Sequence, residues 1–431
     1  MPSDHVHGVD GDDPRSRAAE RAVRRLLLIV ITPLALATIA GLVLLWPGQD
    51  PEVPPEVGPP ATAVKADVEQ ATFRECPPEQ GGGEATCQVA TIRLRGGADT
   101  GLRTELVLNV VANPGIPTLS QGDKIVVQPG GPDPGSYAFV DYQRTRPLLL
   151  LGAVFSVLVV ALARWKGLAA LVGLLVTLVV LAKFVLPAIL DGKDPLIVCI
   201  VGASVTMFVV FYLAHGVTVR SSTALVGTLL SLLVTGLLAM WATTASRLTG
   251  TGTEEALTLN ALAGQVDLRG LLLGGIIIGG LGVLNDVTIT QASTVWQLHL
   301  ADPAASPARL YRQGMRVGRD HIGATVDTLI LAYAGAALPL LIFFSLADRS
   351  AGEVITSSLV AEEVVRSLVG AIGLVLSVPI TTGLAAIAAA RAPVAADDPS
   401  PPPLDRAGSR ARAAARDLLS KRKADPWADG R

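Results

Sequence analysis

The sequence predicts a mainly α-helical integral membrane protein with about eight transmembrane helices and a small extracytoplasmic β-domain. Half of its 431 residues are hydrophobic and only 17% are charged, with a mean hydropathy of +0.49. This composition is typical of multi-pass membrane proteins. Residues 62–143 differ from the rest, because apolar and polar side chains alternate there as they do in half-buried strands.

The chain begins with a polar, arginine-containing stretch, and we expect residues 1–25 to be a disordered cytoplasmic tail. The apolar run 26–46 is long enough to cross a bilayer. No small-residue cleavage pattern follows it, so we predict a retained first transmembrane helix rather than a signal peptide. Residues 47–61 are rich in proline and are predicted to form an extended linker.

Period-two alternation is clearest at residues 90–95 and recurs at 105–110. A third apolar run, 124–128, follows a turn signal, and residues 64–73 supply a further candidate strand. We therefore predict that residues 62–143 form one small β-barrel or sandwich.

The chain contains three cysteines, which is too few for a disulfide scaffold. Cys76 and Cys87 flank a glycine-rich loop of the predicted β-domain. If that domain lies outside the cytoplasm, a disulfide between them is expected. Cys199 lies in an apolar run and is expected to be a small core residue.

Residues 147–390 are almost continuously hydrophobic and predict a seven-helix membrane domain. The predicted spans are 148–163, 168–187, 196–214, 223–241, 270–285, 326–346 and 367–390. Arginine and lysine concentrate in alternate connections, and acidic residues in the others. The positive-inside rule then places both termini in the cytoplasm and the β-domain outside it.

The final segment, 391–431, is a basic tail in which arginine and lysine alternate with alanine and leucine. We predict a cytoplasmic tail that binds anionic lipid headgroups, with each charge contributing about 1 kcal/mol near the surface. No aromatic platform accompanies these charges, so nucleic-acid binding is not expected.

A polar stripe follows from helical spacing in the glycine-rich run that starts at residue 270. Gly275, Gly279 and Gly282 share one face with Asp286 and Thr290. Such glycines let a second helix or a solute approach the backbone, which predicts a helix-packing groove. The acid and the threonine are candidates for transport or ion binding. The alternative is that Asp286 has no function and simply reaches water near the membrane edge. Even at the midplane, insertion of an aspartate costs only about 2.5–3.5 kcal/mol.

A second helix is predicted to begin after Ser306, whose hydroxyl can cap it before a proline. Along this helix Arg316, Asp320 and Asp327 share a face, and Arg316 and Asp320 have the spacing of an ion pair. Asp327 enters the membrane span, so we expect a partner for it. Asp286, through a shared proton or cation, and an arginine of the same loop are the two candidates.

Catalytic motifs are absent, and the five histidines are scattered. We therefore expect neither an enzyme nor a metal site nor a bound cofactor. The chain also lacks a nucleotide-binding motif, so ATP-driven transport would need a partner protein.

Two stretches, LNDVTITQASTVWQL and YRQGMRVGRDHIGATVDTLILAYAGAALPLL, resemble the signature region of the YibE/F-like family of bacterial multi-pass membrane proteins. This signature covers 284–341, and a looser similarity extends through 147–241. The resemblance implies a permease-like protein of the bacterial plasma membrane and leaves its substrate open. By motif position it marks these polar residues: Asp286, Arg319, Asp320, Thr325, Asp327, Thr328 and Tyr333.

Two functions fit the sequence. In the first, a transporter moves a small solute or ion through the glycine- and polar-lined groove, coupled to protons or cations. In the second, a membrane-embedded sensor or assembly partner binds a ligand or protein through its β-domain, and the glycines only pack helices. Both assume the lipid bilayer as surroundings, and a homo-oligomer or protein partner is compatible with either.

Overall fold

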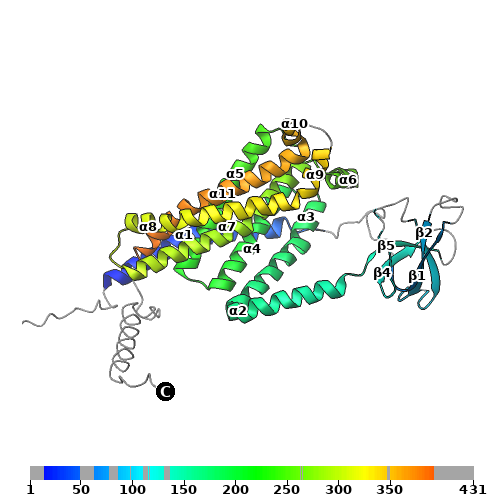
Figure 1. Ribbon diagram of the computed structural model, residues 1–431. Coiled ribbons are helices and arrows are strands. Elements are labelled where there is room, and N and C mark those ends of the chain that lie inside the picture. Colours follow the sequence, from blue (N-terminus) through cyan, green and yellow to red (C-terminus); the bar gives the residue numbers. More distant parts are fainter. Residues whose placement is uncertain are drawn as a thin grey trace, which may run out of the picture. The chain divides into compact units, whose positions relative to one another are not determined.

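The computed structural model describes residues 14–48, 63–76, 86–97, 99–109, 115, 117–130, 136–262, 264, 266–346 and 350–392. These belong to two compact units, one mainly helical and one containing the strands (Figure 1). Most of the predicted linker and the basic tail beyond residue 392 lie outside the described residues.

The strand-containing unit holds one antiparallel sheet with the order β3-β2-β1-β4-β5. Its strands are β1 (Val64–Glu75), β2 (Thr86–Leu94), β3 (Arg103–Leu108), β4 (Lys124–Pro129) and β5 (Tyr137–Tyr142). The alternation predicted for residues 90–95 is confirmed, since Ala90, Ile92 and Leu94 are at most 1% exposed. The two edge strands also contact each other, so the sheet curls toward a barrel. The fifth strand was not predicted.

A disulfide joins Cys76, just after β1, to Cys87 in β2, with 2.06 Å between the sulfur atoms. Both residues are buried. The bond therefore ties together the two longest strands of the sheet.

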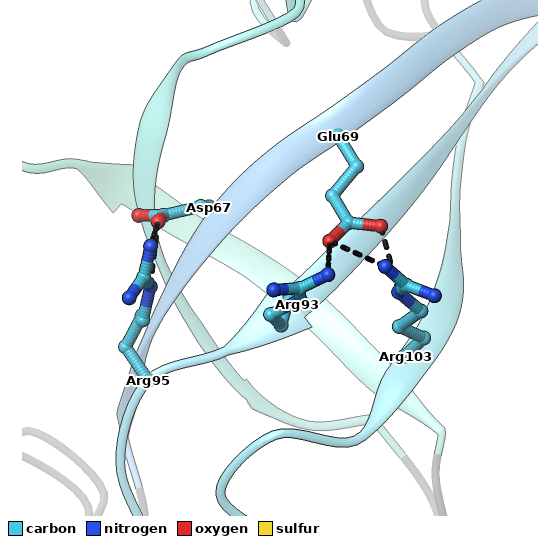
Figure 2. Close-up of polar contacts among 5 residues, drawn as sticks. All are labelled: Asp67, Glu69, Arg93, Arg95 and Arg103. Atoms are coloured by element: carbon cyan, nitrogen blue, oxygen red, sulfur yellow. Dashed lines mark hydrogen bonds and ion pairs between the residues drawn. The ribbon is translucent and has the colours of Figure 1, made fainter.

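Ion pairs cover one face of this sheet (Figure 2). Arg93 and Arg103 are direct cross-strand neighbours, an arrangement in which like charges repel. The register of β1 shifts at Glu69, and its carboxylate contacts Arg93 at 2.5 Å and Arg103 at 2.9 Å. Asp67 pairs with Arg95. The irregular register thus places an acid between two opposed arginines.

Among the described residues, six helices are long and apolar enough to cross a membrane, or seven if the bent pair α8 and α9 is one span. The helices are α1 (Pro14–Leu44), α2 (Thr145–Val180), the π-helix η2 (Leu181–Val185), α3 (Leu186–Leu190), α4 (Pro195–His215), α5 (Val219–Ala245), α6 (Glu254–Leu262), α7 (Leu268–Ala301), α8 (Pro307–Ala336), α9 (Leu338–Leu346), α10 (Ala351–Thr356) and α11 (Ser358–Ala389).

The expected number of eight spans treated 148–163 and 168–187 as separate helices. The helical stretch Thr145–Leu190 consists of two helices that meet at a kink, so the predicted break between these segments is present. Its backbone is interrupted only at Arg164, where φ is 53° and ψ is −130°. A Cβ on Gly167 would lie against the carbonyl of Val159, which would be about 12 Å away in a straight helix, so the chain turns sharply between the two segments.

Two helix boundaries differ from the prediction. The first helix begins at Pro14, so part of the expected disordered tail is helical, as its alanine, arginine and glutamate residues favour. The predicted span 270–285 is the first part of α7, which continues to Ala301 and includes the stripe position Thr290. The polar residues of α7 do not interrupt its helical hydrogen bonds.

The predicted start of the second polar helix is confirmed. Ser306 is the N-cap of α8 and accepts a hydrogen bond from the Arg309 N–H at 3.3 Å. The axis then bends by 58° between α8 and α9, next to Pro339. Pro379 lies inside α11 without ending it.

Candidate functional site

The predicted polar stripe runs along the outer face of α7. Gly279, Gly282 and Asp286 are exposed, and Gly275 and Thr290 are partly exposed. The opposite face is at most 1% exposed at Leu284, Val287 and Val295, and it also carries the fully buried Thr288 and Gln291. The division of α7 into an exposed and a buried face is therefore the one that helical spacing predicts.

The three glycines of this stripe do not receive another helix. A Cβ placed on Gly275 would meet Nη1 of Arg366 at 3.2 Å, and one on Gly279 would meet the Tyr333 hydroxyl at 3.3 Å. A Cβ on Gly282 would meet nothing within 4 Å. Among the described residues, the expected helix-packing groove is therefore open and holds no second helix. Only the side-chain tips of Arg366 and Tyr333 cover one end of it.

Close helix packing involves other glycines. Helix α11 packs against α5, α7 and α8, and α7 also packs against α5 and α8 (Figure 1). A Cβ on Gly373 of α11 would overlap the Thr235 hydroxyl of α5. A Cβ on Gly227 of α5 would lie 2.6 Å from Oγ1 of Thr381 in α11. These contacts seal the interior between α5 and α11.

Polar side chains continue through this sealed interior. The hydroxyls of Thr228 and Thr288 are 2.6 Å apart, and Thr382 donates a hydrogen bond to Oε1 of Gln291 at 3.0 Å. All four residues are fully buried. This cluster was not predicted from the sequence, because single threonines in apolar helices resemble ordinary packing residues.

The acids of α8 point away from its neighbours. Gly314 and Gly318 face α7 and α11, with a Cβ on either meeting their side chains at 2.9 Å or less. Asp320 and Asp327 are seven residues apart, share a face and are exposed. Asp320 is two residues from Gly318, so this face lies on the other side of α8. The expected ion pair between Arg316 and Asp320 is not formed in the described structure.

The candidate carboxylates have no partners in the part of the chain that the structure describes. No hydrogen bond or ion pair joins Asp286 to Asp327 or either acid to an arginine, so neither expected partner for Asp327 is present. The hydroxyl of Thr328 donates to the carbonyl of Ala324 within α8. The described His, Cys, Asp and Glu residues form no group of three that could hold a metal ion.

Helices α7 and α8 run antiparallel, which fixes the height of each acid. Gly318 lies beside Gln291, and farther along α8 Tyr333 lies beside Gly279. Asp286 is about midway between the two α7 residues. It therefore lies at the height of the 320–327 segment of α8.

One end of the stripe opens into a groove of about 560 Å³ that has both apolar and polar side chains in its lining. Thr290, Ser293 and Gln297 line it from α7, and His215 lines it from α4. These side chains offer hydroxyl and amide groups that can replace the water ligands of an ion or a polar solute.

The other end of the stripe is covered. Arg366 of α11 lies against the first stripe glycine and pairs with Glu363 at 3.4 Å. Next to it, Glu362 is buried and accepts a hydrogen bond from the Gly252 N–H at 3.1 Å. Arg366 was not predicted as a site residue. It immediately precedes the predicted span 367–390, and spacing within α11 does not reveal its contact with α7.

A family model described as YibE/F-like protein matches residues 151–391, more than half of the chain. The match includes α7, α8 and α11, and it agrees with the resemblance carried by residues 284–341. No curated protein and no solved structure matches the chain.

Proposed function

The chain belongs to the YibE/F-like protein family, and we propose that it is a multi-pass membrane transporter that moves a small solute or ion along the polar stripe of α7. The stripe supplies an unbroken row of small and polar residues on a 34-residue helix. No other surface of the described helices combines this length with an unpaired acid and an adjoining groove.

The observation that supports transport most directly is the exposure of Asp286 without a partner. An aspartate in the middle of a membrane helix costs about 2.5–3.5 kcal/mol, and this cost falls when the group is hydrated or binds a cation. A water-filled path along the stripe would provide both. Asp286 would then bind the proton or cation, and Thr290 would supply a neighbouring oxygen.

The proposed orientation follows the distribution of charge. Both termini face the cytoplasm of a bacterial plasma membrane, and the strand-containing unit lies outside it. The disulfide of that unit is compatible with an oxidising compartment. The basic tail would bind anionic headgroups on the cytoplasmic side.

Under this orientation the covered end of the stripe faces outward. Arg366 and Tyr333 would then control access from outside, since only their side-chain tips lie over the stripe glycines. Rotation of two side chains would open this end without separating any packed helices. No catalytic step is part of the proposal.

The experiment is a flux measurement on the full chain in liposomes, with an internal pH dye and an imposed membrane potential. We expect flux in the unmodified protein and its loss in Asp286→Asn, because the amide keeps the size of the side chain and removes its charge. Glu255→Gln is the matched control, since Glu255 is an exposed acid of α6 away from the stripe. Equal flux in Asp286→Asn and the control, with folding intact, would refute the role of the stripe acid.

A sensor or assembly role is the second candidate, because the strand-containing unit has its own buried core and its own disulfide. This role predicts that Asp286→Asn retains function and that removal of residues 62–143 abolishes it. Measurement of flux and of ligand-induced stabilisation on both variants separates the two candidates.

A further inference from the structure

We infer that two copies of this chain associate through the outer faces of α7 and α8, and that Asp286 of one copy pairs with Arg319 of the other. The pairing itself does not depend on transport. We also infer that the second copy covers the open side of the stripe, and this part rests on the proposed function.

The first support is the charge on this surface. The outer face of α8 carries exposed arginines and acids together, including Arg316, Arg319, Asp320 and Asp327. None of them forms an ion pair within the described chain. An identical surface on a second copy supplies both signs of charge and can pair these groups.

The second support is the position of the open glycines. A Cβ on Gly282 of α7 or on Gly323 of α8 would meet nothing within 4 Å. Most glycines between the helices of the bundle, such as Gly318 and Gly373, are in tight contact with a neighbour. Exposed glycines on two adjacent helices allow a further helix to approach closely.

The third support is the height of the two charges. Copies inserted with the same topology are related by a two-fold axis along the membrane normal, so each residue keeps its height. Asp286 lies at the height of the 320–327 segment, and Arg319 is four to five residues from the middle of that segment, roughly 7 Å along the axis. The long arginine side chain spans this difference. When α8 of one copy lies over α7 of the other, the same contact forms twice.

Paired cysteines test the contact directly. Cys76 and Cys87 are bonded to each other and Cys199 is buried, so introduced cysteines are the reactive ones. We expect the double variant Asp286→Cys, Arg319→Cys to form a covalent dimer in membranes treated with a short bismaleimide. Each single variant should remain largely monomeric. Leu175→Cys, on an exposed apolar position of α2, is the control for random collision.

Charge reversal tests the pairing without a cross-link. Asp286→Arg and Arg319→Asp should each weaken the dimer about three- to twentyfold, and the double reversal should restore it. The dimer fraction is measured in lipid nanodiscs by counting bleaching steps of a labelled chain. A monomer at every protein density, or a dimer unaffected by both single reversals, overturns the inference.

The two proposals fail in distinguishable ways. A dimer without flux contradicts only transport. Flux from a protein that stays monomeric contradicts the dimer and leaves the proposed transport standing.

Discussion

Substitution of Gly373 by alanine tests whether α5 and α11 are in close contact. The added Cβ would overlap the Thr235 hydroxyl and lie 3.0 Å from its Cγ2. Thr235 is fully buried and its hydroxyl donates to the Ser231 carbonyl at 2.8 Å, so it has no free space to move into. The two helices must therefore move apart.

The expected size follows from two opposing effects. Overpacking by one methyl group in a tight core costs about 1–3 kcal/mol. Replacing glycine by alanine within a helix returns about 0.5–1 kcal/mol. A net loss of about 1–2 kcal/mol lowers the unfolding midpoint by about 2–8 °C for a core of this size.

The assay is thermal unfolding of the full chain in detergent, followed by tryptophan fluorescence. Gly370→Ala is the matched control one turn away, since its Cβ would make only an ordinary contact at 3.8 Å with Leu329. We expect no loss of stability in this control. The double variant Gly373→Ala, Thr235→Ala should recover part of the loss, because it removes the overlapping hydroxyl and methyl groups. A midpoint for Gly373→Ala equal to that of the control would refute the close contact.

Three further predictions concern the strand-containing unit. Cys76→Ser removes a bond between residues 11 apart in sequence and should lower the free energy of unfolding by about 2–3 kcal/mol, measured by denaturant titration without reductant. Glu69→Gln leaves two opposed arginines without their shared acid and should cost up to about 1 kcal/mol, with a smaller difference at high salt in the same titration. The hydrogen bond from Arg144 holds the pKa of the exposed Asp141 carboxyl below its usual 3.8. The associated stability is present above that value and is lost as pH falls through the lowered pKa, so NMR titration should show the Asp141 pKa return toward 3.8 in Arg144→Gln.

The sheet was predictable where one strand face is buried. Alternation at residues 90–94 requires one side of β2 to face the core, and the structure has this arrangement. The strand β5 was missed because its burial does not alternate, with Val140 and Asp141 both exposed. The shift of register at Glu69 was also unpredictable, since it depends on the pairing of β1 with β2.

The sequence predicts which residues share one face of α7, but it does not predict what that face contacts. Spacing assigns Gly282 and Asp286 to one side of α7, and both are exposed. It does not determine which glycines receive a neighbouring helix, because that depends on how helices meet in space. The sequence analysis therefore assigned packing to the stripe glycines, whereas Gly227 and Gly373 have that role.

The sealed interior and the open stripe together restrict the mechanism. A route through the bundle centre would require α5 and α11 to separate, which breaks the contacts of Gly227 and Gly373 in every cycle. A route along the stripe requires only that Tyr333 and Arg366 move. Gly373→Ala should then reduce stability and leave flux at temperatures well below the unfolding midpoint nearly unchanged, while Gly282→Leu should block flux without loss of stability. The opposite pattern, in which Gly373→Ala alters flux and Gly282→Leu does not, would move the path into the bundle centre.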